Sequence, residues 1–430
     1  MSEAQLLRDR DAFIEAIASY VTASPTSYHA ARAAAEALAG AGFTAREETA
    51  AWAPVESEDR GFVVRDGAII AWRAGAGVGP TSPVRVLGTH TDSPGFVLKP
   101  DPDFVAEGWS QLGVEVYGGP LLNSWLDRDL GVAGRLIDRD GAEHLAATGP
   151  IARIPQLAIH LDREANTGLA LDRQRNTQPI IAVGVGRLSI LELLAESAGV
   201  AAPDIVGVDA RLFDTQAPER IGVGSELFAS ARLDNLSSTF AGLAALLETE
   251  PAPGTISMLA AFDHEELGSG TRSGAAGPFL EDVIERLRIA LGATAEESAR
   301  ALAASWCVSA DAGHSVHPNY SEKHDPRVHP LAGQGPMLKV NANQKYASDA
   351  HGAAIWTRAC ERAGVPTQSF VSNNTVPCGS TIGPITATRL GIRTVDVGVP
   401  LLSMHSAREL AHVDDLHGLV RVAGAFFAGA

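Results

Sequence analysis

Cysteine is scarce in this sequence, which limits the chemistry that could hold a metal ion or cross-link the fold. The chain of 430 residues contains three cysteines, Cys307, Cys360 and Cys378, and no two of them form a C-x-x-C pattern. An odd number without that spacing indicates neither a disulfide framework nor a thiolate zinc site. Any metal ion bound here would therefore be held by histidine and carboxylate side chains.

Clusters of basic residues and long apolar stretches are also absent. The formal net charge is -17 and no run of Lys and Arg interrupts it, so nucleic acid and anionic membrane surfaces are excluded as partners. No stretch of about 20 apolar residues could cross a bilayer. The segment MSEAQLLRDRDAF is charged and lacks the apolar core of a secretion signal. The sequence therefore predicts a cytoplasmic protein without a membrane partner.

The pattern of apolar residues predicts an α/β protein with a β-rich insertion. Residues 11–40 have the apolar spacing of two helices, and GFVVRDGAIIAW predicts a hairpin that turns at Asp66. Short strand-like pieces dominate the middle of the chain. After them, Ala-rich helical patterns alternate with apolar runs, which favours a parallel α/β sheet. We expect a discontinuous α/β domain of residues 1–94 and 227–430 and an inserted module of residues 95–226.

Acidic residues and histidines follow several of the apolar runs. In an open α/β sheet the crevice lies outside the carboxyl ends of the strands, where such side chains converge. They are His90 and Asp92 of VRVLGTHTD, Glu265 and Glu266 of TISMLAAFDHEE, Asp311 of WCVSADAGH, His405 of TVDVGVPLLSMH, and Asp234 of SARLDNLSS. So many carboxylates would repel one another unless cations neutralised them. Histidine nitrogen with carboxylate oxygen suits zinc, and about five ligands exceed the three that one catalytic zinc uses. This count favours two metal ions that share a carboxylate.

Two pairs of nearby residues suit this interpretation. His90 and Asp92 lie two apart on an extended segment, so the carboxylate could orient the imidazole. An isolated H-x-D is more often a polar strand end. Glu265 and Glu266 can diverge on an irregular turn, with one binding a metal ion and the other acting as a general base. An isolated pair of glutamates is as often a solvated loop.

Several longer motifs resemble those of one enzyme family. GTHTDSPGFVLKP, ARLDNLSS, DHEELGSG, SADAGHSVHPNYSEKHDP, GPMLKVNANQKYASDA, NNTVPCGSTIGPI and LLSMHSARE follow one another along nearly the whole chain. They resemble the aspartyl aminopeptidase family of dinuclear zinc exopeptidases. The resemblance implies a three-layer αβα catalytic domain of residues 1–94 and 227–430. It also implies that residues 95–226 form a mainly β dimerisation domain.

The resemblance further implies a set of ligands for two zinc ions per subunit. His90, Asp234 and Asp311 would bind one ion. Asp234, Glu266 and His405 would bind the other, so that Asp234 forms the bridge.

Two more carboxylates would take part in the reaction. Asp92 would fix the tautomer of His90 and raise its basicity. Glu265 would be the general base that activates the bridging water and later returns the proton to the leaving amine.

The same resemblance implies four residues that contact the substrate. His314, Lys339 and Tyr346 match positions that line the substrate pocket, and Lys339 would pair with an acidic first side chain. His160, in LAIHLDR, matches a histidine that reaches into a neighbouring subunit's site and can stabilise the oxyanion there.

The expected function is removal of N-terminal Asp or Glu from short peptides by a water molecule activated by two zinc ions. The family also implies self-association as a dimer and as a tetrahedral dodecamer. Two alternatives stay open: a dinuclear zinc carboxypeptidase or deacylase of the same fold, and a catalytically silent assembly subunit. The silent subunit should have lost Glu265 or a ligand, and this sequence has lost none.

Overall fold

The computed structural model describes residues 5–430, and a nine-stranded sheet forms its centre. The strands lie in the order β1-β2-β3-β13-β4-β14-β18-β16-β17. Their bounds are β1 Thr44–Ala45, β2 Arg60–Arg65, β3 Ala68–Ala74, β4 Val84–His90, β13 Ile256–Phe262, β14 Trp306–Ala310, β16 Met337–Lys339, β17 Gln368–Phe370 and β18 Arg393–Gly398. The predicted hairpin is confirmed, because β2 and β3 pair antiparallel on either side of Asp66.

The direction of the strands corrects the expectation of a parallel sheet. The four central strands β13, β4, β14 and β18 are parallel to one another. However, β3 is antiparallel to β13, and β16 is antiparallel to β18. The tight hairpin reverses the chain between β2 and β3, so these two strands cannot both follow the direction of the centre. The sheet is therefore mixed.

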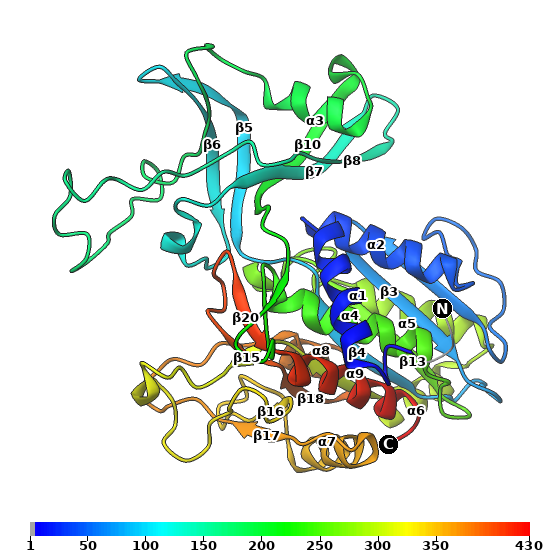
Figure 1. Ribbon diagram of the computed structural model, residues 1–430. Helices are drawn as coiled ribbons and strands as arrows, with labels where there is room; N and C mark the ends of the chain where they lie inside the picture. The colour runs from blue at the N-terminus through cyan, green and yellow to red at the C-terminus, as the bar shows by residue number, and fades with distance from the viewer. Residues whose placement is uncertain (1–4) are drawn as a thin grey trace.

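Helices cover both faces of this sheet, as Figure 1 shows. One layer contains α1 Arg10–Ala23, α2 Ser27–Gly40, α4 Leu233–Glu248, α7 Ala350–Ala363 and α9 Val413–Phe427, and the other contains α5 Phe279–Ala290, α6 Ala295–Ala304 and α8 Ile382–Leu390. Alternate residues of β13 pack into the two layers: Leu259 and Ala261 into the first, Met258 and Ala260 into the second. The predicted three-layer αβα arrangement is confirmed.

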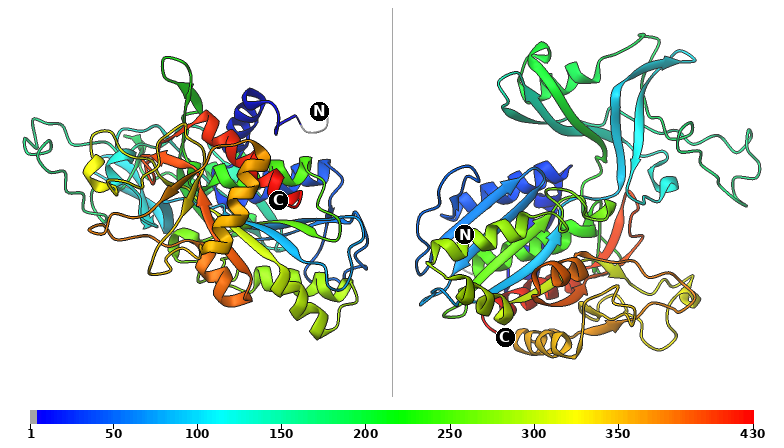
Figure 2. Two further views of the ribbon diagram at one scale, coloured as in Figure 1. Left: turned by 90° about the horizontal axis from the view of Figure 1, so that it is seen from below. Right: turned by 180° about the vertical axis from the view of Figure 1, so that it is seen from behind.

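A second sheet stands apart from these layers (Figure 1 and Figure 2). Its order is β8-β7-β10-β5-β6-β9, and all its strand pairs are antiparallel. The bounds are β5 Gly95–Ala106, β6 Trp109–Tyr117, β7 Leu130–Asp138, β8 Glu143–Ala147, β9 Ile180–Val183 and β10 Ile205–Asp214, with helix α3 at Ile190–Ala198. The sheet and α3 share a separate apolar core, in which Leu112, Val132 and Leu194 are buried. The β-rich texture expected for the middle of the chain corresponds to this sheet.

A third, five-stranded sheet joins distant parts of the chain beside the ends of the central strands. Its order is β11-β12-β20-β19-β15, and its bounds are β11 Glu219–Ile221, β12 Leu227–Ser230, β15 Gly313–His314, β19 Pro400–Leu402 and β20 Glu409–His412. The strand β11 pairs with β12 and not with the six-stranded sheet. The division into residues 1–94 with 227–430 and residues 95–226 stays a proposal. The chain passes from the six-stranded sheet to the five-stranded sheet between Asp214, the end of β10, and Glu219, the start of β11.

Across residues 5–430, none of the helices combines the length and the apolar composition that a membrane span requires.

Candidate active site

The central parallel strands bring the predicted ligands to one edge of the sheet. His90 is the last residue of β4, and Asp311 directly follows β14. Asp234 lies at the start of α4, where the side chain of Asn235 donates to the carbonyl of Ala310 at 2.8 Å. His90 Nε2 is 3.2 Å from Asp234 Oδ1 and 3.4 Å from Asp311 Oδ1. One ligand atom from each of these three residues lies within 4.8 Å of the other two.

A second group with metal-binding geometry shares Asp234 with the first. His405 Nε2 is 3.5 Å from Asp234 Oδ2 and 3.3 Å from Glu266 Oε1. Asp234 thus turns one carboxylate oxygen toward each histidine. The three residues of this group also offer ligand atoms within 4.8 Å of one another. The structure therefore brings together all five residues predicted as ligands, in the two sets that the sequence motifs imply.

Asp92 lies behind His90 and organises the glutamate pair. His90 Nδ1 is 3.0 Å from the backbone carbonyl of Asp92 and 3.4 Å from its Oδ1. The same carboxylate accepts the backbone N–H groups of Glu265 at 3.0 Å and Glu266 at 3.2 Å. These two residues open a single turn of 3-10 helix, Glu265–Leu267. Glu265 also belongs to a third group with His90 and Glu266, in which ligand atoms lie within 4.8 Å of one another.

The buried carboxylates of this cluster favour a bound cation. Burial raises the pKa of the Glu265 carboxyl to about 9 and that of Glu266 to about 7, because negative charge is unfavourable there. Burial disfavours charged His405, but its contacts with Asp234 and Glu266 outweigh burial and raise its pKa to about 11. Asp234 Oδ1 is buried and has no well-directed hydrogen bond from any residue in the range 5–430. A bound cation would satisfy that oxygen and neutralise the carboxylates.

The predicted substrate residues lie in different surroundings. His314 and Tyr346 line a pocket of about 240 Å³ that also contains His317, Lys323 and His324. No Asp or Glu is among the residues that line this pocket.

Lys339 lies behind Asp311 and is only 2% exposed. Its Nζ donates to the carbonyl of Ala312 at 2.7 Å, and it is 3.9 Å from Asp311 Oδ2. It also lies 5.5 Å from the centre of the Tyr346 ring. Lys339 is therefore close to the cluster, with its charge directed partly toward a predicted ligand.

His160 is not brought to the cluster within this chain. It lies exposed in a turn of the long segment between β8 and β9, and it belongs to none of the three groups with metal-binding geometry.

Comparison with known proteins identifies the family. The model of the family described as aminopeptidase I zinc metalloprotease (M18) matches residues 20–427. The chain belongs to the M18 aminopeptidase family. It is similar to the probable M18 family aminopeptidase 2 of Streptomyces avermitilis, with 52% identity over 419 residues and 96% of each chain covered. The corresponding protein of Stutzerimonas stutzeri is 43% identical over 432 residues, covering 98% of this chain and 99% of the relative.

Two solved structures have the same fold. A chain of the Ape4 and Nbr1 complex superposes with a TM-score of 0.94 at 34% identity, covering 100% of this chain and 88% of that chain. The S. cerevesiae mApe1 dodecamer gives a TM-score of 0.84 at 29% identity, covering 97% of this chain and 96% of that one. M18 membership makes this chain a zinc-dependent aminopeptidase by family. This agrees with the aminopeptidase expectation rather than with a carboxypeptidase or deacylase.

Two residues at the M18 site, Glu409 and Tyr117, escaped the sequence analysis. Glu409 accepts the backbone N–H groups of Asp234 at 2.9 Å and His405 at 2.7 Å, and burial raises its pKa to about 8. Its place four residues after His405 in LLSMHSARE was a usable signal. Tyr117 donates its hydroxyl to Asp92 at 2.8 Å, and its sequence context VEVYGG is that of an ordinary strand end.

Proposed function

We propose that this M18 protein removes N-terminal Asp or Glu from short peptides with the help of two zinc ions. The observation that carries the proposal is the pair of metal-ligand groups that share Asp234. They lie beside a pocket lined by cationic and neutral residues. His90, Asp234 and Asp311 would hold one ion, and Asp234, Glu266 and His405 the other. Zinc bound in such a set lowers the pKa of water and polarises a carbonyl oxygen.

Glu265 would move the proton in this reaction. Its backbone N–H donates to the Asp92 carboxylate, and one of its own carboxylate oxygens lies within 4.8 Å of ligand atoms of His90 and Glu266. It would accept a proton from the attacking water as the water oxygen bonds to the peptide carbonyl carbon. As the C–N bond breaks, the same proton would pass to the leaving amine, and Glu265 would be a carboxylate again. No other proton carrier is needed for a complete turnover.

The pocket with His314 and Tyr346 favours an acidic first residue. His317, Lys323 and His324 give it positive or neutral polar character, and it contains no carboxylate that would repel the substrate. This local attraction acts against the net charge of -17, which repels acidic peptides at long range. Lys339 would add a buried positive charge beside Asp311 and Tyr346.

Glu265→Gln tests the proton transfer. The amide keeps the shape of the side chain but cannot take up a proton, so kcat should fall by about 10² to 10⁴ while zinc content stays near that of the wild type. Hydrolysis of an aspartyl reporter and metal analysis measure the two quantities. His264→Asn, at the adjacent side chain whose Nδ1 is 3.0 Å from the Thr271 hydroxyl, serves as the control. A Glu265→Gln enzyme that retains more than half of the wild-type kcat refutes the role.

Lys339→Met tests the origin of the specificity. If Lys339 attracts the acidic side chain, kcat/KM should fall at least about tenfold more for an aspartyl reporter than for an alanyl reporter, because a hydrogen bond to a charged group is worth roughly 1.5 to 3 kcal/mol. Zinc content is measured in parallel, since Lys339 also lies 3.9 Å from Asp311.

The matched comparison is Lys323→Met, which removes the same charge from the exposed part of the pocket. An equal loss on both reporters in Lys339→Met would move the specificity to another residue. A selective loss in Lys323→Met alone would assign it to Lys323.

We further propose that His160 acts in the site of a partner subunit. The side chains of Leu157, Ile159 and Leu161 around it are exposed apolar groups, which is typical of a surface that a partner covers. One structural relative is described as a dodecamer. A histidine supplied in this way would donate a hydrogen bond to the substrate carbonyl oxygen as negative charge develops there.

Mixing two inactive variants tests this proposal. When His160→Ala and Glu265→Gln subunits exchange, a mixed pair contains one site with an intact base and an intact borrowed histidine, so partial activity should return. Glu265→Gln mixed with Asp234→Ala is the control, because no mixed pair then has a complete site. Activity that stays absent despite demonstrated subunit exchange, or a fully active monomer in light scattering, contradicts the role in trans.

A further inference from the structure

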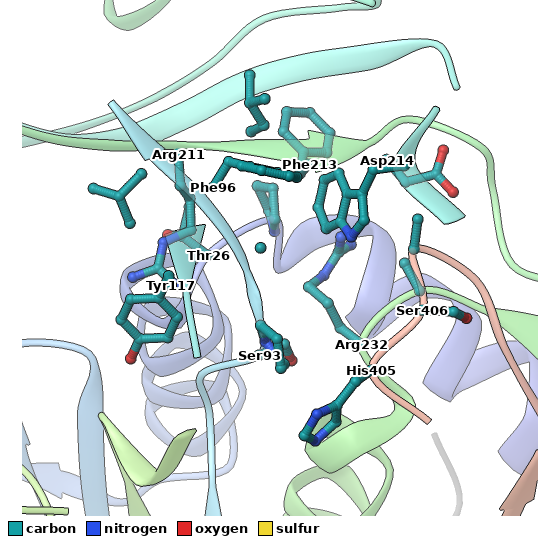
Figure 3. Close-up of a pocket in the computed structure, with 18 of the residues that line it drawn as sticks. Thr26, Ser93, Phe96, Tyr117, Arg211, Phe213, Asp214, Arg232, His405 and Ser406 are labelled. Carbon is teal, nitrogen blue, oxygen red and sulfur yellow. The ribbon is translucent and has the colours of Figure 1, made fainter. Parts of the chain in front are cut away.

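The turn Tyr117–Leu121 leads from the six-stranded sheet past the carboxylate cluster. Tyr117 is the last residue of β6 and pairs with Gly95 of β5. Figure 3 shows Tyr117, Ser93 and His405 around one pocket, with Arg211 of β10 beside Tyr117. Through this turn the six-stranded sheet contacts Asp92 and the predicted zinc ligand His405.

Tyr117 contacts Asp92, which in turn contacts His90 of the first metal-ligand group (His90, Asp234 and Asp311). Its hydroxyl donates to Asp92 Oδ2 at 2.8 Å, and both residues are buried. Asp92 Oδ2 also accepts the N–H of Glu266, while Oδ1 accepts the N–H of Glu265 and lies 3.4 Å from His90 Nδ1. A rotation of the Asp92 carboxylate would therefore move all three of these contacts together. The Tyr117 hydroxyl, which donates to Oδ2, opposes such a rotation.

The same turn directly contacts the second metal-ligand group (Asp234, Glu266 and His405). The carbonyl of Gly119 is 3.0 Å from His405 Nδ1, which leaves Nε2 free to face Asp234 and Glu266. The N–H of Leu121 donates to the carbonyl of His405 at 2.9 Å. Gly118 has φ +67°, and a Cβ at that position would lie 3.2 Å from the Cβ of Glu266. The turn therefore packs against this group as closely as a residue without a side chain allows.

The six-stranded sheet packs against the ring of Tyr117. The Arg211 guanidinium lies 4.7 Å from the centre of the Tyr117 ring, and Tyr117 is 8% exposed. The ring is thus confined between residues of β6 and β10 on one side and Asp92 on the other. The ring of His264, with its centre 6.4 Å from that of Tyr117, lies near it as well.

We propose that Tyr117 is a positioning residue. Through the turn Tyr117–Leu121, the zinc-binding geometry of each chain then depends on the six-stranded sheet of the same chain. This inference rests on the ligand roles proposed above. It differs from the role of His160, because Tyr117 acts within its own chain and on the metal ligands, whereas His160 would act on the substrate of a partner. The insertion would then have two separate functions at the site.

Tyr117→Phe tests the inference because it removes only the hydroxyl. Loss of a hydrogen bond that orients metal ligands typically costs about 10- to 100-fold in metal affinity or activity, so the apoprotein should bind zinc that much more weakly. With zinc in excess, kcat should fall while KM stays within about twofold of the wild type. The cobalt-substituted variant should show a changed visible absorption spectrum, which reports ligand geometry without any substrate.

Tyr28→Phe is the matched control. Tyr28 is also 8% exposed, and its ring lies 4.3 Å from the guanidinium of Arg135, a residue of β7. It therefore contacts the same inserted sheet, but none of the described residues forms a hydrogen bond with its hydroxyl. Any general loss of packing between the insertion and the α/β layers should affect both variants equally in thermal unfolding. Only Tyr117→Phe should change zinc affinity and the cobalt spectrum.

The inference is overturned if Tyr117→Phe keeps zinc affinity, kcat and the cobalt spectrum of the wild type, or if Tyr28→Phe changes them to the same extent. Zinc affinity and the cobalt spectrum are measured without a substrate. A wild-type enzyme that prefers alanyl reporters would contradict the proposed specificity and leave the zinc comparison between the two variants intact.

Discussion

Buried negative charge at the carboxyl edge of the central sheet is the constraint on which the site depends. Asp92, Asp234 and Asp311 are buried there, with Glu265 and Glu266 beside them. Carboxylates this close are unfavourable as anions unless positive charge lies among them. The buried Lys339, whose Nζ is 3.9 Å from Asp311, supplies only part of that charge. Zinc adds positive charge in an M18 metalloprotease, and the ligand atoms here lie within 4.8 Å of one another, close enough to hold a metal ion.

The fold supports this charge through backbone and hydroxyl donors rather than through arginines. Asp92 accepts two backbone N–H groups and the Tyr117 hydroxyl. Glu409 accepts the N–H groups of Asp234 and His405. Neutral donors of this kind fix a carboxylate without competing with a metal ion for its charge. The three sheets meet at these contacts, since Tyr117 ends a strand of the six-stranded sheet and Glu409 begins a strand of the five-stranded sheet.

Much of the site could be predicted from the sequence because its residues follow recognisable strands. His90 ends one apolar strand, Asp311 directly follows another, and the glutamate pair comes shortly after a third, and parallel strands bring these ends together. The antiparallel position of β3 beside β13 could not be predicted, because a buried strand has the same apolar pattern in either direction. Tyr117 and the close contact of Lys339 with Asp311 depend on segments far apart in the sequence, and periodicity carries no information about such pairs. The exposed position of His160, in the segment between β8 and β9, likewise has no signature in the periodicity of the sequence.

The number of zinc ions per chain tests the central claim most directly. The apoprotein is titrated with zinc, and bound metal is counted by elemental analysis for the wild type and for Asp234→Ala. The shared carboxylate predicts two ions per chain in the wild type and the loss of both in the variant, because both proposed zinc sites, His90–Asp234–Asp311 and Asp234–Glu266–His405, use Asp234. A wild type that saturates at one ion, or a variant that keeps one zinc fully bound, would contradict the account.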